Sequence, residues 1–264
     1  MMTQCHRFLF VLALFPAALI ASAPASAQWL DVDPYNNAFF AEITWRDINM
    51  RTERMAAERK RNRTTAPKTT PRKAAPPETP VRQNAAPRPL AAASANLNFA
   101  PTLALAQSLG IRSLVALHRK DQQATVKSQY VTMISSFNDS VPRLYGVKKN
   151  NLATGMAALL TGAYVAYHNR PFPDALVKPL VTQLEAALGE DANLTGKPAA
   201  EKERAYHIMV GVGMGLQVAQ AEAAKSTDPR AAAKLKQLGA DLFRQLHIQN
   251  PDSVQFTNAG MSLR

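Results

Sequence analysis

The chain has 264 residues, a net charge of +12 and 47% hydrophobic residues. This length and apolar content are enough for a folded core, which excludes a wholly unfolded chain. A single cysteine, Cys5, excludes a disulfide framework and a cysteine-ligated metal. The sequence lacks the G-x-S-x-G and H-E-x-x-H motifs of hydrolases. It therefore predicts no catalytic, cofactor-binding or metal-binding residues, and no cofactor.

Residues 1–27 have the organisation of a secretory signal peptide. Arg7 precedes the apolar run Phe8–Ile20, and a small-residue Ala-Ser-Ala sequence ends at Ala27. The run of 13 residues is shorter than the roughly 20 that span a bilayer as a helix. We expect cleavage after Ala27 and a periplasmic or secreted bacterial protein, which would remove Cys5. The alternative is an uncleaved membrane anchor.

Residues 28–58 form an aromatic N-terminal segment with Trp29, Phe39, Phe40 and Trp45, and it includes both tryptophans of the chain. The spacing of its apolar residues is compatible with a short amphipathic helix. Two interpretations remain open. The aromatic side chains either pack on the chain's own domain or contact another protein of the cell envelope.

Residues 59–95 are rich in proline and basic residues and contain almost no large apolar side chains. Such a composition predicts a disordered linker. Across residues 51–90, eleven Lys and Arg stand against three acids, a net charge of +8. The charge indicates either a solvated spacer, which we favour, or a segment that binds anionic lipid or glycan. Because no aromatic residues alternate with the cations, specific nucleic-acid recognition and base stacking are not expected.

Residues 96–264 show helical periodicity in successive segments, which predicts an all-α fold with a single bundle-like domain of about six helices. The expected helices cover residues 103–118, 122–137, 152–168, 175–188, 201–224 and 228–247. Gly146 is typical of a helix end, Asn150 or Asn151 of a helix start, and Asp228-Pro229 of another start. Residues 251–263 are expected to form an irregular segment across the bundle.

The stretch Leu152–Tyr167 contains no charged residue in 16 positions. It is too short to cross a membrane comfortably, and cations flank it on both sides. We therefore interpret it as the buried central helix of the bundle, and the alternative is a membrane segment. The mature chain is expected to have no transmembrane helix.

Gly211, Gly213 and Gly215 have a G-x-G spacing that also occurs in phosphate-binding loops. A dinucleotide-binding loop follows a strand, whereas these glycines lie inside an expected helix. We favour close helix packing on two faces, because an interior glycine costs up to about 1 kcal/mol relative to alanine unless packing offsets it.

The histidines and carboxylates of the mature chain allow structural explanations. The mature chain has four histidines, His118, His168, His207 and His247, and no two of them have the spacing of a metal-binding pair on a helix. Three lie near expected helix ends, where the helix dipole favours positive charge. His207 lies near methionines, which would suit copper or ordinary core packing, and we favour packing. Glu203 lies in an expected first helical turn, where the dipole also explains it.

The sequence resembles an uncharacterised family of exported proteobacterial proteins over residues 142–263. The resemblance rests on Tyr145-Gly146-Val147, Asn151-Leu152-Ala153, Ala163-Tyr164-Val165-Ala166-Tyr167-His168, Asp174-Ala175 and Lys202-Glu203-Arg204-Ala205-Tyr206. It implies a signal peptide, a low-complexity middle and a helical C-terminal domain of unknown function. It transfers no catalytic residues to this chain.

Two functions of different classes follow from these observations. The leading hypothesis is a non-enzymatic binding or interaction protein of the bacterial envelope. The alternative is an enzyme or small-ligand carrier with a site between the helices, near Tyr164, Tyr167, His168 and Tyr206. A cleft where these four side chains converge would favour the alternative. A secreted toxin-like effector is a third possibility.

Overall fold

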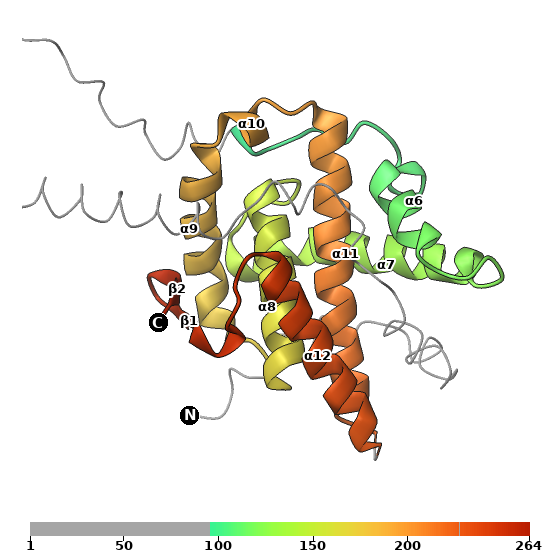
Figure 1. Cartoon of the computed structure of the whole chain (residues 1–264). Helices are drawn as coiled ribbons and strands as arrows, with labels where there is room; N and C mark the ends of the chain where they lie inside the picture. The colour runs from blue at the N-terminus through green and yellow to red at the C-terminus, as the bar shows by residue number, and fades with distance from the viewer. Residues whose placement is uncertain (1–95, 227) are drawn as a thin grey trace, which may run out of the picture.

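The computed structural model describes residues 96–226 and 228–264, which form an all-α domain with one small two-stranded sheet. The expected signal peptide, the aromatic segment with Trp29, Phe39, Phe40 and Trp45, and the basic linker lie outside the described residues. The prediction of an all-α, bundle-like domain is confirmed (Figure 1).

Seven α-helices occur in the described part of the chain: α6 (Leu109–Ala116), α7 (Gln123–Tyr145), α8 (Leu152–His168), α9 (Val177–Gly189), α10 (Ala192–Thr195), α11 (Ala199–Ala223) and α12 (Pro229–Gln245). Six of them correspond to the expected helices. The short α10 was not expected, and it begins after the capping side chain of Asp191.

The helix boundaries follow the local capping residues. Asn151 caps α8, because its side-chain oxygen accepts hydrogen bonds from the backbone N–H groups of Ala153 and Thr154. Gly146 ends α7 in the left-handed conformation with φ 62°. Asp228 caps α12, with proline at the first helical position. These starts and ends agree with the sequence-based expectations.

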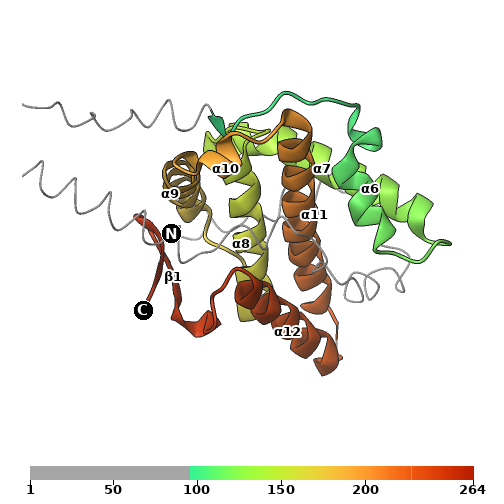
Figure 2. The same cartoon turned by 45° about the horizontal axis from the view of Figure 1, so that its top comes forward.

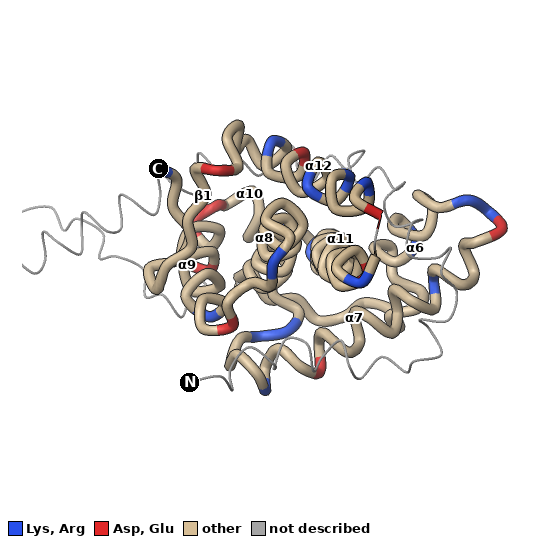
Figure 3. Tube along the Cα trace, turned by 90° about the horizontal axis from the view of Figure 1, so that it is seen from below, with Lys and Arg blue, Asp and Glu red and all other residues tan. Residues whose placement is uncertain are grey.

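Helices α8 and α11 form the centre of the domain and make the most extensive contact between any two described elements. Seen along the bundle, they are surrounded by α6, α7, α9 and α12 (Figure 3). Helix α8 contains no Lys, Arg, Asp or Glu. Every residue from Leu152 to Ala166 of α8 is buried. The prediction of a buried central helix is therefore confirmed. Among the described residues, no helix has both the length and the apolar character needed to cross a membrane.

The glycines of α11 permit close packing on two faces. A Cβ on Gly211 would lie 2.5 Å from Cδ1 of Leu114 on α6, whereas a Cβ on Gly213 would lie 2.2 Å from the carbonyl oxygen of Ala158 on α8. Because both glycines lie in the interior of a helix, the packing interpretation holds and the phosphate-loop interpretation does not.

The C-terminal segment is more regular than expected. A 3₁₀ turn (Pro251–Ser253) leads into a hairpin of β1 (Val254–Thr257) and β2 (Gly260–Leu263), paired antiparallel from Val254 opposite Leu263. The side chain of Gln183 on α9 pairs with the backbone of Met261 as both donor and acceptor, at 2.7 and 2.6 Å. The segment expected to be irregular is thus a hairpin held against α9, because the buried side chain of Gln183 forms hydrogen bonds with the backbone at the edge of the hairpin.

Residues 96–108, which we call the strap, cross one end of the bundle before α6 begins. The strap passes α10 and the first turns of α11, so that it covers the ends of the two central helices (Figures 1 and 2). It contains one 3₁₀ turn (Leu105–Gln107). This placement creates the pocket described below.

Candidate ligand-binding pocket

The strap is fixed to the bundle at its N-terminal end by three bonded contacts. Asn98 forms an isolated antiparallel bridge with Asn151, and the two side chains are joined by a hydrogen bond of 2.8 Å. The ammonium group of Lys202 donates to the carbonyl oxygens of Asn96 and Thr195, at 2.8 and 2.7 Å. Burial lowers the pKa of Lys202. The start of α11 therefore holds the strap in place.

Glu203, the next residue on α11, binds the middle of the strap. Its carboxylate oxygen Oε2 accepts hydrogen bonds from both the backbone N–H, at 3.0 Å, and the hydroxyl of Thr102. The side chain is buried, with 2% of the residue exposed. Its second oxygen, Oε1, has no hydrogen-bond partner among the described residues. The buried carboxylate thus has one oxygen with two hydrogen bonds and one oxygen with none.

His207 lies one helical turn further along α11 and binds the end of the strap. Its Nδ1 lies 3.0 Å from Oγ of Ser108, and only 3% of the residue is exposed. The same Oγ accepts the backbone N–H of Ile111 at 3.2 Å and caps α6. The serine hydroxyl can donate to Nδ1, and with this pairing the imidazole proton lies on Nε2.

Burial lowers the pKa of His207 to about 4, and the negative charge of Glu203 opposes this effect only in part. The imidazole is therefore neutral at physiological pH. In this form His207 can offer an N–H donor but brings no positive charge to balance the carboxylate of Glu203.

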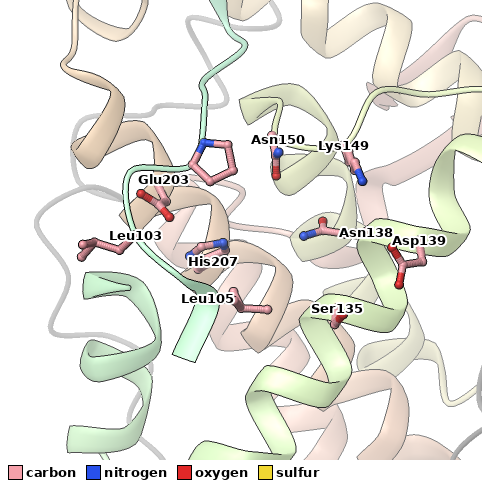
Figure 4. A pocket seen from close by; sticks show the side chains of 10 residues that line it. Leu103, Leu105, Ser135, Asn138, Asp139, Lys149, Asn150, Glu203 and His207 are labelled. Atoms are coloured by element: carbon pink, nitrogen blue, oxygen red, sulfur yellow. The ribbon is translucent and has the colours of Figure 1, made fainter. Parts of the chain in front are cut away.

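Glu203 and His207 form one wall of a pocket of about 270 Å³ that lies between the strap, α7, the turn before α8 and α11 (Figure 4). Its lining residues are Pro101, Leu103, Leu105, Ser135, Asn138, Asp139, Lys149, Asn150, Glu203 and His207. The strap contributes the apolar side chains, whereas α7, α11 and the turn before α8 contribute the polar ones. This combination of an apolar surface with a few polar groups is typical of small-molecule sites.

Asn138 is held in place by the core beneath the pocket. The hydroxyl of Tyr206 donates to Oδ1 of Asn138 at 2.6 Å, and the ring of Tyr206 packs edge-on against Phe99 of the strap with centroids 5.4 Å apart. This bond uses the amide oxygen and leaves the amide nitrogen of Asn138 available as a donor. The nitrogen points toward the side of the pocket where His207 lies (Figure 4).

The alternative site expected from the sequence, near Tyr164, Tyr167, His168 and Tyr206, does not coincide with this pocket. Tyr164, Tyr167 and His168 do meet at the end of α8, with ring centroids of 4.5 Å from Tyr164 to His168 and 5.0 Å from Tyr167 to His168. They pack against Phe172 and other aromatic rings of the C-terminal region. Tyr206 lies instead under the strap, so the four side chains do not line one cleft.

Glu203 does not lie in the first helical turn as expected, because α11 begins at Ala199 and its first turn contains Glu201. Its side chain is buried against Thr102 and lines the pocket. The packing explanation of His207 holds, although its contact with Ser108 could not be read from the sequence. One signal could have identified both residues. Glu203 and His207 are ionisable residues four positions apart, so they lie on the same face of the helix. The residues between them include Ala205 and Tyr206, so this part of the helix is largely apolar.

The other histidines have local roles. His168 is the last residue of α8, at the expected helix end, but burial lowers its pKa, so the dipole explanation, which needs a positive charge, does not account for it. His118 and His247 follow the last residues of α6 and α12, and Nε2 of His118 lies 3.3 Å from the hydroxyl of Tyr130. Within residues 96–226 and 228–264, no group of three or more His, Cys, Asp or Glu side chains is arranged to hold a metal ion.

The model of a family of unknown function, DUF6683, matches residues 4–264. The chain belongs to DUF6683. The match spans nearly the whole sequence, so it includes the strap, α7 and α11, the elements that form the pocket. Membership in DUF6683 agrees with the resemblance to a family without known function, whereas proteobacterial origin and export stay predictions. No curated protein and no solved structure gives a significant match to the chain.

Proposed function

We propose that the chain is an exported, non-enzymatic binding protein of the bacterial envelope whose helical domain holds a small polar ligand in the Glu203 pocket. The observation that carries this proposal is the oxygen Oε1 of Glu203, which is buried and has no hydrogen-bond partner among the described residues, on a side chain that lines the pocket. A buried acceptor without a partner costs about 1–3 kcal/mol, and more when it is charged. A ligand that donates to Oε1 recovers this free energy on binding.

Binding accounts for the pocket better than catalysis does. Ser108 and His207 are within hydrogen-bond distance, which resembles a nucleophile and its base. However, Ser108 is completely buried, and its oxygen caps α6, so it cannot attack a substrate in the pocket. The hydroxyl of Ser135 does line the pocket, but among the described residues no hydrogen bond links it to His207 or Glu203.

The envelope location rests on the N-terminal sequence. Residues 1–27 have the charged start, apolar run and small-residue end of a signal peptide, and a binding protein for small polar ligands would meet its ligand after export. Expression of the full chain in a bacterium, followed by N-terminal sequencing, tests this part. We expect a mature chain that begins at Gln28, and an uncleaved chain in the cytoplasm would contradict export.

A thermal-shift screen of small polar compounds tests the ligand pocket itself. The mature chain is compared with Ser135→Phe, which fills the pocket from α7, and with Ser128→Phe, an exposed site on the same helix that is not part of the lining. We expect compounds that raise Tm for the unmodified chain and the Ser128 variant but not for the Ser135 variant. Compounds that stabilise all three equally would show that the pocket does not bind them.

A further inference from the structure

The geometry points to a small aliphatic primary amine as the ligand, with its ammonium group bound to Oε1 of Glu203. This inference rests on the proposed function, because it names the chemical class that the same pocket would take. The carboxylate oxygen can only accept hydrogen bonds, so the group that binds it must be a donor. That donor is either a neutral group or a cation, and the charges around Glu203 favour a cation.

Among the residues that the structure describes, no cation is paired with the carboxylate of Glu203. The ion pairs between described residues join other side chains at the surface, such as Lys197 with Glu201 and Lys225 with Glu222. Lys202, the neighbour of Glu203 in sequence, turns its ammonium group to the carbonyl oxygens of Asn96 and Thr195 instead. Buried charges in proteins are normally paired, so a cationic ligand would complete this site.

The other ionisable groups of the pocket do not replace that cation. His207 lies one turn away but is neutral, because burial lowers its pKa to about 4. Lys149 also lines the pocket, but it lies on the opposite side from Glu203 and its side chain is exposed (Figure 4). Asp139 also lines the pocket and is exposed like Lys149, so these two opposite charges largely offset each other. The buried carboxylate of Glu203 is the charge that makes the pocket more attractive to a cation than to an anion.

The other lining residues indicate what kind of group the rest of the ligand carries. Leu103, Leu105 and Pro101 of the strap form an apolar surface beside the carboxylate. A cavity of about 270 Å³ is smaller than most sites for drug-sized molecules and suits a short aliphatic chain. The strap is held to α11 by Glu203 itself, so the apolar surface and the charge occupy fixed positions relative to each other.

The test compares matched amines and alcohols. Binding of butylamine, 5-aminopentanoate and cadaverine is measured against 1-butanol and pentanoate, with the mature chain and its Glu203→Gln variant. We expect the unmodified chain to bind at least one amine roughly tenfold more tightly than the uncharged or anionic compound of the same length. Glu203→Gln should remove that preference, because the amide has no charge and presents a donor in place of an acceptor.

Glu201→Gln is the matched control, because Glu201 lies on the same helix but its side chain is 57% exposed. It should bind amines like the unmodified chain. Equal binding of amines and alcohols by the unmodified chain would overturn the amine assignment while leaving the pocket intact, and this comparison stays decisive if Glu203→Gln does not fold. If every compound stabilised the Ser135→Phe chain and the Ser128→Phe control equally, the proposed function itself would be wrong.

Discussion

Gly162 and Gly213 bring the backbones of α8 and α11 into direct contact: a Cβ on Gly162 would lie 2.4 Å from the carbonyl oxygen of Gly213. Real Cβ atoms do not approach a backbone oxygen so closely, so neither position accepts a larger residue without moving a helix. The same close approach fixes the position of α11, which carries Lys202, Glu203 and His207 to the strap. The packing of the core and the geometry of the pocket are therefore linked.

Replacement of Gly213 by alanine should destabilise the domain strongly. The new methyl group would meet the backbone of Ala158, which cannot rotate away, so we expect a loss of about 3 kcal/mol in the free energy of unfolding. Gly211→Ala is the comparison, since its methyl group would meet side-chain atoms, the end of Leu114 and the ring of Tyr130, in place of backbone, and we expect about 1 kcal/mol. Denaturant unfolding measures both, and equal losses would contradict the close crossing.

Asn151→Ala tests the anchor of the strap. The change removes the cap of α8 and the hydrogen bond to Asn98, so we expect a loss of about 2 kcal/mol. Asp228→Ala removes only an exposed cap with one hydrogen bond to the N–H of Arg230, and about 1 kcal/mol is expected. A loss no larger than that of the control would mean that the Asn98 contact does not stabilise the domain.

The neutral state of His207 predicts a dependence of stability on pH. Its pKa falls from 6.5 in the unfolded chain to about 4 in the fold, so only the unfolded chain takes up a proton between these values. Stability is fully present above pH 6.5 and is lost as the pH falls toward 4, by about 3 kcal/mol from this residue. His118 and His168 act in the same direction, because their pKa values are also lowered by burial.

His207→Asn separates this contribution from the others, because the amide oxygen can still accept from Ser108 but does not titrate. Urea unfolding of both chains at pH 7 and pH 4 gives the comparison. The variant should lose about 3 kcal/mol less than the unmodified chain between the two pH values. The same pH dependence in both chains would show that His207 takes up its proton equally in the folded and unfolded states.

The two tryptophans of the chain, Trp29 and Trp45, report on the aromatic segment alone. The interpretation that this segment contacts another envelope protein requires that it does not belong to the core of the helical domain. Deletion of residues 28–50 should then leave Tm within about 2 °C of the intact chain, with solvent-exposed tryptophan emission before deletion. A large fall in Tm would show that Trp29, Phe39, Phe40 and Trp45 pack on the domain.

The helices were predictable because their apolar residues recur at helical spacing and their ends carry Asn151, Gly146 and Asp228. Helix α7 continues to Tyr145, beyond the expected end at residue 137, because Asn138 and Asp139 interrupt the apolar pattern without breaking the helix. Its Pro142 lies in the last turn, where it lacks the N–H that would bond to the carbonyl oxygen of Asn138, and the helix ends three residues later at Tyr145.

The pocket could not be predicted from the sequence because its partners are far apart along the chain. Thr102 and Glu203 are separated by 101 residues, and Ser108 and His207 by 99. Nothing in the local sequence of the strap indicates which helix it crosses. Helix α11 is buried on most of its faces, so amphipathic patterning does not show that Glu203 is directed toward a cavity.

The backbone N–H of Thr102 offers the most direct measurement, because it donates to the carboxylate whose other oxygen is assigned to the ligand. The N–H of Arg230 is the internal control, since it donates to the exposed carboxylate of Asp228 at 2.9 Å, away from the pocket. Titration of ¹⁵N-labelled mature chain with butylamine should shift the amide signal of Thr102 and leave that of Arg230 in place. Shifts of both signals alike, or of neither, would contradict a binding site at Glu203.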